Sequence, residues 1–484
     1  MGNAKAIFFL VGEINKGKYS LFLLVPKEKR IPQMQQTFMK TKPVLPLVLS
    51  MSLPMVVSMM VASLYNIVDS YYVAKISEDA MTALSLVFPV QNLINAVTIG
   101  FSIGANAVIS YHLGAQDSQK ANAAATQSVV FNAIHGLLLT IGCIAVMPFF
   151  LRLFTTDEQV VDMGVRYSRI AFTFAVFIAI SMSLEKIFQA AGKMLMTMIC
   201  MMSGCVANIL LDPILIFGWG PFPEMGMEGA ALATGIGQTL SLAMYCICYF
   251  VGKLPVRLCF TANTFNPRLT RKMYSVGIPA TLNLALPSLL ISCLNVLLAA
   301  YSQIYVLVLG VYYKLQTFLY LPANGIVQGM RPIIGYNFGA KEYSRVEKIY
   351  RVALAISACI MAIGTILCWS IPGKLIGLFS TNADTIAVGS TALQIISIGF
   401  VVSSISIISC GALEGLGMGF PSFIISLLRY ALLIIPFAFI LSRLFDAVGV
   451  WHAFWVTEVI TAIIAYCLYR KKVSIRNAEI NKDL

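Results

Sequence analysis

Long apolar runs alternate with short polar segments along this chain, and each run is long enough to cross a bilayer, which takes about 20 residues in a helix. The runs over 44–71, 80–110 and 303–335 are longer than a crossing needs, so we expect those helices to tilt or protrude. The pattern predicts an all-α integral membrane protein with twelve transmembrane helices. The twelve runs cover 44–71, 80–110, 121–149, 164–187, 194–218, 229–251, 273–300, 303–335, 346–371, 388–411, 419–441 and 449–469.

Composition supports this interpretation. Of the 484 residues, 58% are hydrophobic and 11% are charged, whereas a soluble protein carries roughly 25% charged residues. The net charge of +13 comes from Lys and Arg at the ends of apolar runs rather than from one clustered face. We therefore expect a lipid bilayer as partner and no nucleic acid. Most of the cysteines lie inside apolar runs, which suggests neither a disulfide framework nor a zinc site.

Basic residues also predict the orientation. They gather in the loops after spans six and eight and in the C-terminal tail, whereas the loops after spans three and five carry acids. The positive-inside rule then places both termini in the cytoplasm of a multi-pass bacterial inner-membrane protein. The basic residues are Lys253, Arg257, Arg268, Arg271 and Lys272, then Arg331, Lys341, Arg345 and Lys348, then Arg470, Lys471, Lys472 and Arg476.

The chain repeats itself at an offset of 225 residues. A gapless series of matches across four spans is more than chance supplies, and each half then holds six spans, so both halves enter from the same side. This predicts two six-helix lobes related by a pseudo-twofold axis along the membrane normal, an arrangement that suits alternating access. Channels and membrane enzymes are also duplicated, so the repeat favours a transporter without proving one. The matches include Pro54 with Pro279, Gly100 with Gly325, Gly104 with Gly329, Gly164 with Gly389 and Gly192 with Gly417, and Gly229 matches Gly449 at an offset of 220.

The repeat and the charge pattern together predict the domain organisation. Two short apolar patches before residue 33 lack the apolar core of a signal peptide, so we expect a poorly ordered or artefactual extension. The predicted segments are an extension over 1–40, an N-lobe over 41–252, a cytoplasmic linker over 253–272, a C-lobe over 273–470 and a cytoplasmic tail over 471–484.

Ionisable residues inside a membrane span are functional hypotheses by default. Asp69 lies roughly 36 Å and Asp212 roughly 27 Å from the cytoplasmic end of their spans at the rise of an α-helix. Asn208 lies one turn below Asp212 on the same face, and Thr234 enters span six from the outside. All four converge on the outer half of the first lobe. The alternative is that Asp69 ends a helix at the interface and that Asp212-Pro213 forms a turn.

Carboxylate, amide and hydroxyl oxygens are hard ligands that suit Na⁺, and two neighbouring acids can hold a proton between them. Position 69 aligns with Leu294 in the second half, so ion coupling is predicted in the first half alone. Proline removes a helical hydrogen bond and favours bending. We therefore predict conformational hinges at Pro54, Pro213 and Pro279.

Two further charged residues are interpreted differently. Glu414 lies near the cytoplasmic end of span ten and aligns with Gln189, so we expect it to be a solvated loop residue. Arg331 lies at the inner end of span eight, where we expect it to act as an anchor at the level of the lipid headgroups.

Several motifs together resemble the multidrug and toxic compound extrusion (MATE) family, in particular its MepA-like bacterial branch. The resemblance runs from about residue 40 to 470. The motifs that carry it are 64–69 (LYNIVD), 113–115 (LGA), 208–213 (NILLDP), 227–234 (MEGAALAT) and 332–340 (PIIGYNFGA).

This resemblance implies a monomeric exporter of bulky, often cationic drug-like molecules, driven by inward H⁺ or Na⁺ and without an organic cofactor. It also implies that Asp69, Asn208, Asp212 and Thr234 form the coupling site, with Na⁺ held there if Na⁺ is the coupling ion. One position departs from the branch, because Arg331 stands where glutamine is usual. A fixed positive charge there would alter inward gating or repel a cationic substrate.

Other functions stay open or are disfavoured. A flippase for a lipid-linked precursor would share the two-lobe architecture. It would need a more basic cavity, and Arg331 is the one residue that hints at such a cavity. An exporter of one specific metabolite is a further alternative. We expect no enzyme, because His112, His135 and His452 have no Asp or Glu at a sequence spacing that would indicate a catalytic pair. The sequence also contains no phosphate-binding Gly-x-x-x-x-Gly-Lys-Ser/Thr loop, which disfavours ATP drive within the chain.

Overall fold

A computed structural model of the protein describes residues 37–252, 254–260 and 264–482, and it describes side chains as far as residue 473. Most of the described residues lie in helices, and none of them lies in a strand. The helices of the first half are α1 (Phe38–Thr41), α2 (Val44–Ala74), α3 (Glu78–Gly114), α4 (Ser118–Arg152), α5 (Glu158–Thr173), α6 (Ala175–Ala190), α7 (Met194–Phe217) and α8 (Gly226–Val251).

The second half repeats this series with one additional short helix and one π-helical turn. Its elements are α9 (Pro267–Ala299), α10 (Gln303–Gly339), α11 (Tyr343–Ser370), α12 (Pro372–Gly377), α13 (Ala383–Ser397), α14 (Phe400–Gly415), α15 (Gly419–Leu427), the π-helical turn η3 (Leu428–Leu432) and α16 (Ile434–Lys482).

The helices account for twelve membrane crossings. Among the described residues, nine helical segments are long and apolar enough to span, and two bent pairs, α5 with α6 and α13 with α14, bring the number to eleven. The segment Gly419–Val473 is 55 residues long, which at 1.5 Å per residue is more than twice a hydrocarbon core of about 30 Å. Its backbone is non-helical at Phe445 and Asp446, which divides it into two crossings. The predicted twelve-helix all-α fold is confirmed.

The two bent spans show that the repeat extends to irregular features. The first pair is bent by 42° at Phe174 and the second by 55° next to Gly399, and these two residues are 225 positions apart. By contrast, α2, α7 and α9 continue as helices through Pro54, Pro213 and Pro279. The role of these prolines as hinges therefore stays a prediction.

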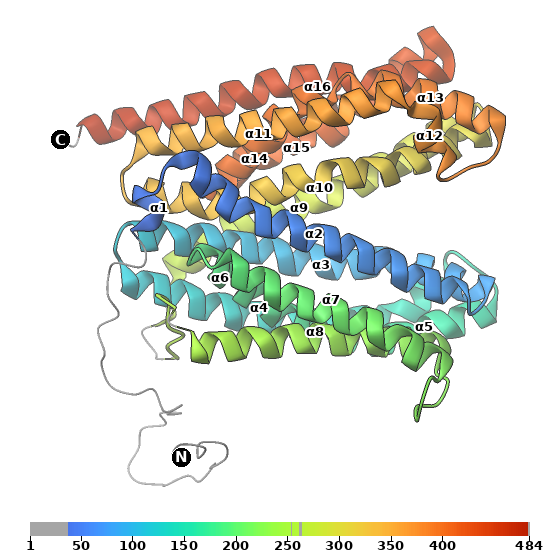
Figure 1. Ribbon diagram of the computed structural model, residues 1–484, viewed down its shortest axis with the longest axis horizontal. Coiled ribbons are helices and arrows are strands. Elements are labelled where there is room, and N and C mark those ends of the chain that lie inside the picture. Colours follow the sequence, from blue (N-terminus) through green and yellow to red (C-terminus); the bar gives the residue numbers. More distant parts are fainter. Residues whose placement is uncertain (1–36, 253, 261–263, 483–484) are drawn as a thin grey trace.

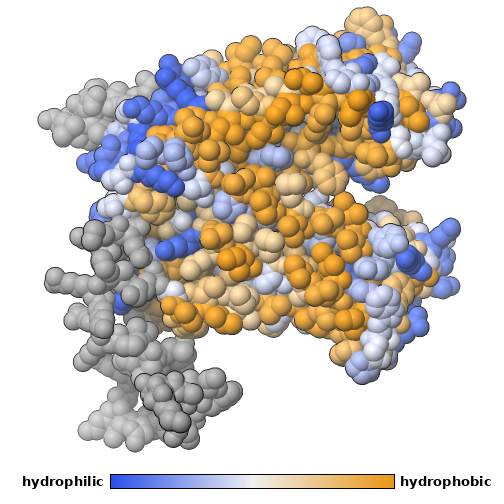
Figure 2. Space-filling view, viewed as in Figure 1, coloured by the Kyte–Doolittle hydropathy of each residue, from blue (hydrophilic) through white to orange (hydrophobic). Residues whose placement is uncertain are grey.

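The helices form two groups that follow the two halves of the chain. In Figure 1, α2 to α8 lie below and α9 to α16 lie above, and α1 lies at the same end of the bundle as the end of α16. We call this the α1 end. Figure 2 shows an apolar band across the middle of the same face, with polar residues at both ends. This distribution is the one a bilayer requires, because hydrocarbon cannot solvate polar side chains.

The predicted domain boundaries stay predictions, but several elements near them are clear. Residues 1–36 of the predicted extension lie outside the described part of the chain. The residues after them form α1, where Met39 is buried and its carbonyl accepts a hydrogen bond from Asn337. Helix α9 begins at Pro267, inside the predicted linker, and α16 continues to Lys482 through the predicted tail.

The halves pack closely against each other in the part of the bundle that carries the α1 end. Helix α3 packs on α9, and α2 packs on α10. A Cβ added at Gly104 would lie 2.1 Å from the carbonyl oxygen of Met273, and one at Gly329 would lie 2.5 Å from the hydroxyl of Ser52. These two glycines are a matched pair of the repeat, so both halves use the same position to bring their backbones together. At the opposite end, Figure 2 shows the surface hollowed between the halves.

Candidate functional site

Three of the four predicted coupling residues form one hydrogen-bonded cluster in the first half. Asn208 and Asp212 lie one turn apart on α7, and both are buried. The Nδ2 group of Asn208 donates to Oδ1 of Asp212 at 3.2 Å and to the hydroxyl of Thr234 on α8 at 3.2 Å. The cluster therefore joins α7 to α8 through a single amide.

Asp69 approaches this cluster from α2, which packs along α7. Its negative charge lies close enough to that of Asp212 for the two to repel each other. In the part of the chain that the structure describes, Asp69 Oδ1, Asp212 Oδ2 and Asn208 Oδ1 are buried and have no hydrogen-bond partner. Buried polar atoms are normally satisfied. Three unpartnered oxygens in one place can therefore accept a proton or a cation.

The alternative interpretation of the two acids as helix-end and turn residues is wrong. Helix α2 continues past Asp69 to Ala74, and α7 runs through Asp212 and Pro213 to Phe217. Both carboxylates are therefore carried by regular helix rather than by a helix end or a turn.

Two tyrosines beside the acids escaped the sequence analysis. Tyr65 lies one turn before Asp69 on α2, and Tyr167 projects from α5. Both side chains are close enough to interact electrostatically with the carboxylates of Asp69 and Asp212. The Tyr167 side chain also hydrogen-bonds that of Gln91 on α3. The i−4 spacing of Tyr65 from Asp69 could have indicated the first tyrosine, whereas no local pattern indicates the second.

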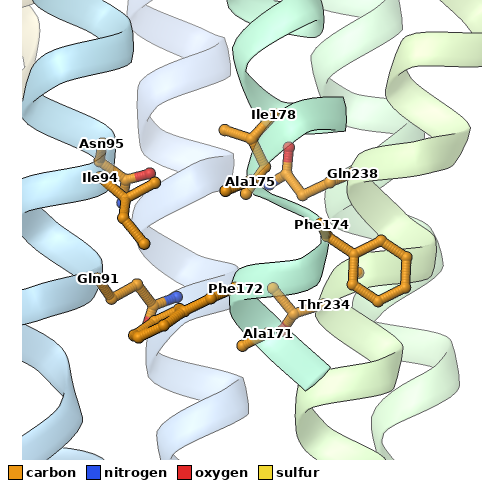
Figure 3. A pocket seen from close by; sticks show the side chains of 11 residues that line it. Gln91, Ile94, Asn95, Ala171, Phe172, Phe174, Ala175, Ile178, Thr234 and Gln238 are labelled. Carbon is orange, nitrogen blue, oxygen red and sulfur yellow. The ribbon is translucent and has the colours of Figure 1, made fainter. Parts of the chain in front are cut away.

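A small cavity continues the polar region beyond Thr234 (Figure 3). Its volume is about 20 Å³, which is room for about one water molecule. Gln91 and Asn95 of α3 face Thr234 and Gln238 of α8 across it, and the break between α5 and α6 at Phe174 closes one side. The amide side chains supply the polar partners that a buried water needs.

The same positions in the second half are apolar. At the repeat offsets of 225 and 220, the counterparts of Asp69, Asn208, Asp212 and Thr234 are Leu294, Leu433, Phe437 and Phe454. The second half therefore has no equivalent of the acid cluster at these positions.

A buried ion pair lies one helical turn away from those apolar positions. The Nε and Nη2 groups of Arg429 lie 2.7 and 2.6 Å from Oε1 of Glu458, and Arg429 is only 7% exposed. Arg429 is on the π-helical turn η3, with its guanidinium over the rings of Tyr320 and Tyr430. The sequence analysis missed this pair, although both residues are charged and lie inside predicted spans, which is the signal that should have identified them.

Arg331 and Glu414 form a second buried pair, which corrects both expectations for these residues. Their charged groups are 2.5 Å apart, with side-chain exposures of 17% and 4%. Glu414 is therefore not a solvated loop residue, and Arg331 is not a headgroup anchor. The expectations were wrong because α10 and α14 extend to Gly339 and Gly415, so both residues lie inside helices that face each other.

A third pair lies in the first half, where Lys186 Nζ is 2.7 Å from Oε1 of Glu185 and both side chains are buried. The sequence analysis missed this pair as well. The buried carboxylates Glu185, Glu414 and Glu458 thus each have a basic partner. Within the described residues, no Lys, Arg or His lies within ion-pair distance of Asp69 or Asp212. The acid cluster is therefore the place where the spans carry uncompensated negative charge.

Comparison with known proteins identifies the family. The family model described as MatE matches residues 54–214 and 279–440, so it matches each half once, at the repeat offset of 225. The chain belongs to the MatE family. The predicted resemblance to the multidrug and toxic compound extrusion family is confirmed.

MATE relatives cover nearly the whole chain. The multidrug export protein MepA of Staphylococcus aureus (strain MSSA476) is 27% identical over 460 residues, which cover 92% of this chain and 98% of the relative. MepA of Staphylococcus saprophyticus is 26% identical over 89% of this chain and 95% of its own length. This chain is thus a multi-pass membrane protein of a transporter family, not of an enzyme family.

Solved structures with the same fold include an outward-facing multidrug resistance MATE transporter of the MOP superfamily. It has a TM-score of 0.86 and 22% identity over 93% of this chain and 99% of its own. A MOP superfamily transporter from Pyrococcus furiosus, described as having a binding pocket of reverse polarity, has the same TM-score and identity over 92% of this chain and 99% of its own. The two-lobe architecture is therefore that of known MATE structures.

The acid cluster fits a monovalent cation better than a transition metal. Among the described residues, no three His, Cys, Asp or Glu side chains gather where they could hold a metal ion. A Na⁺ at this MATE site would depend on Asp69, Asp212, the Asn208 carbonyl and the Thr234 hydroxyl, which are all oxygen donors. Their unpartnered oxygens have the right chemistry for Na⁺, and the two acids alone suffice for a proton.

Proposed function

We propose that this protein is a secondary antiporter that exports bulky cationic or amphipathic compounds in exchange for inward H⁺ or Na⁺. The observation that carries the proposal is the charge difference among the buried acids. Among the residues that the structure describes, Asp69 and Asp212 have no basic partner, whereas the other buried carboxylates described above are all paired. An uncompensated buried carboxylate is costly, so this site gains most from binding a proton or a cation.

The coupling follows from where the ion binds and what it joins. Asp69 is on α2, Asp212 and Asn208 are on α7 and Thr234 is on α8. A bound ion draws these three helices together, and its release lets the carboxylates repel each other. An ion that binds one arrangement of the helices more tightly shifts the equilibrium toward it. Export follows if substrate binds the arrangement that the ion does not favour.

The packing of the halves supports alternating access. The close glycine contacts near the α1 end hold the halves together there, and the surface is hollowed at the opposite end. We assign the α1 end to the cytoplasm, because the basic loops and the C-terminal tail lie there. The described state then corresponds to one open toward the outside of a bacterial inner membrane, and rocking of the two lobes would expose the other side.

The Arg331–Glu414 pair weakens the alternative of a lipid-precursor flippase. Arg331 was the one indication of a basic cavity, and the nearby Glu414 carboxylate offsets its charge. The same pairing removes the objection that a fixed positive charge at Arg331 would repel a cationic substrate.

The test is efflux of a cationic dye from vesicles that contain the purified protein, with pH and Na⁺ gradients imposed separately. The gradient that drives efflux identifies the ion. Asp69→Asn should abolish gradient-driven efflux while the protein remains folded. Asp162→Asn makes the same chemical change at a carboxylate that is 62% exposed, and it should leave efflux intact. Undiminished efflux by Asp69→Asn would rule out the proposed site.

A further inference from the structure

We propose that the Arg331–Glu414 pair sets the charge preference of the substrate path, with Glu414 making a path that contains Arg331 acceptable to cations. This inference rests on the proposed export function and adds a residue pair that selects the class of substrate. The pair leaves no net charge at this level of the path, so amphipathic molecules with a positive charge are accepted, whereas an uncompensated Arg331 would favour anions of the same shape.

The position of the pair places it beside the contact between the halves. Gln328, one turn before Arg331 on α10, lies 3.5 Å from the side-chain amide of Gln189 in the first half, and its own amide contacts the sulfur of Met59 on α2. A molecule that passes between the halves at this level therefore passes within about a turn of Arg331.

The two charges are not equally accessible. The Arg331 side chain is 17% exposed, whereas that of Glu414 is 4% exposed. A passing molecule therefore meets the guanidinium, and the carboxylate acts from behind it. Such an arrangement repels cations unless the carboxylate keeps its negative charge and its position.

The surroundings of Glu414 hold its carboxylate in position. Its Oε1 atom accepts hydrogen bonds from Asn283 of α9 at 3.1 Å and from Ser422 of α15 at 3.1 Å, while Oε2 faces Arg331. Three donors from three helices therefore fix the carboxylate beside the guanidinium. The Nε group of Arg331 is buried with no acceptor among the described residues, so Arg331 is held less completely than its partner.

The fold itself does not require charges at these positions. At the repeat offset of 225, Arg331 and Glu414 correspond to Asn106 and Gln189, which are both neutral. Asn106 and Gln189 are buried and hydrogen-bonded at their positions in the first half. These two positions are therefore filled by uncharged residues in the first half, where Gln189 donates to Glu185 of the Glu185–Lys186 pair, and a buried pair is weak evidence of a stabilising role. A role in selecting the substrate therefore explains the Arg331–Glu414 pair better than a role in stability.

The experiment measures binding of two ions of similar shape and opposite charge, tetraphenylphosphonium and tetraphenylborate, to the purified full-length protein by equilibrium dialysis. E414Q leaves the Arg331 charge uncompensated, so the preference for the cation over the anion should fall by at least about ten-fold. R331N leaves the Glu414 charge and should change the preference by a similar factor in the opposite direction. The double variant R331N/E414Q, which installs the residues of the first half, should return to within about three-fold of the original preference.

Control measurements separate charge from folding. E347Q removes a carboxylate that pairs with Arg351 and Arg470 near the surface of the second half, and it should leave the preference unchanged. If E414Q does not fold, R331N and the double variant still measure the effect. Equal changes for both probes, or no change in the preference for R331N, would overturn the inference while leaving export intact. A wild-type protein that binds neither probe would overturn the proposed function and this inference with it.

Discussion

The region around α7 and α8 and the equivalent region around α15 and α16 share a backbone plan but bury different charges. In the first, Asp212 lies with Asn208, Thr234 and a second acid, and none of the basic residues in the described part of the chain is within ion-pair distance. In the second, those positions are apolar, and Arg429 and Glu458 neutralise each other one turn away. The acid cluster can take up a proton or a cation without breaking an ion pair. In the second region the charges of Arg429 and Glu458 already cancel each other.

Under the proposed function, this difference accounts for a coupling site in only one half of the duplicated fold. A carboxylate without a partner is stabilised by binding a proton or a cation, so its occupancy follows the ion gradient. A carboxylate that is paired with arginine already has its charge balanced, so it gains less from binding a proton or a cation. We therefore expect the paired region to contribute to stability and the unpaired region to contribute to transport.

The largest effect is expected when the Arg429–Glu458 ion pair is broken. Glu458→Ala leaves the guanidinium of Arg429 buried without a partner, and removing one member of a buried pair costs about 3–5 kcal/mol. We expect a clear drop in the thermal unfolding temperature of the purified protein. The double variant Arg429→Met with Glu458→Leu is the control, and it should recover most of the loss. An unchanged unfolding temperature for the single variant would contradict the assigned role.

The matching change in the acid cluster should affect transport rather than stability. Asp212→Asn removes a buried charge and keeps the shape of the side chain, so stability should be unchanged or slightly higher. Gradient-driven efflux should fall by more than about ten-fold, because the ion loses one of its two carboxylates. Efflux and unfolding temperature measured on one preparation would show whether the two properties separate. A large loss of stability would mean that this carboxylate is structural.

A smaller effect is expected at the edge of the acid cluster. Thr234→Val removes the hydroxyl that accepts from Asn208. Losing one such hydrogen bond costs about 1 kcal/mol, which corresponds to about a five-fold weaker ion affinity. Thr239→Val is the matched control, since that hydroxyl donates to the carbonyl of Gly235 on the same helix. Equal effects of the two substitutions would show that Thr234 does not contact the ion.

The smallest expected effect concerns the start of two equivalent helices. They are α4, which follows span two in the first half, and α11, which follows span eight in the second half. Asp117 caps α4 and pairs with Lys120, while Glu342, 225 residues later, makes no side-chain cap at α11. Asp117→Ala should cost about 1 kcal/mol as a lost cap, and Glu342→Ala should cost less, because it loses only an exposed ion pair with Lys40. Thermal unfolding of both variants at neutral pH measures the difference.

That cap should also depend on pH. The hydrogen bond and the charge of Lys120 hold the pKa of Asp117 below its usual value. The folded state thus binds the proton more weakly than the unfolded state, so the contribution of Asp117 is present above its unfolded pKa of about 3.9 and is lost as pH falls through the folded value. The difference between wild type and Asp117→Ala should shrink on acidification and stay constant above about pH 5.

Much of the fold could be predicted because its signals are local. A span shows as an apolar run, and the repeat shows as matched residues at a constant offset. The placement of Asn208 and Asp212 on one helical face follows from their spacing of four residues. The neighbouring Thr234 came from the resemblance and from its depth, and the structure then placed its hydroxyl 3.2 Å from Asn208.

Most of the misses share one cause, which is separation along the chain; the adjacent residues Glu185 and Lys186 are the exception. Arg331 and Glu414 are on different helices, 83 positions apart, and each looked like a residue of a loop or a headgroup layer when considered alone. Arg429 and Glu458 are 29 positions apart, and Tyr167 reaches the acids from a helix that the motifs do not include. No local pattern shows that such groups meet.

The sequence by itself determined that this protein spans the membrane in twelve helices, that it is built from two related halves and that acids lie inside the first half. These properties depend on the periodicity, the composition and the positions of residues, which the chain carries without being folded. Only the tertiary structure decided which charges are neutralised. Compensation depends on distances of a few ångströms between side chains on different helices, and those distances are set by packing.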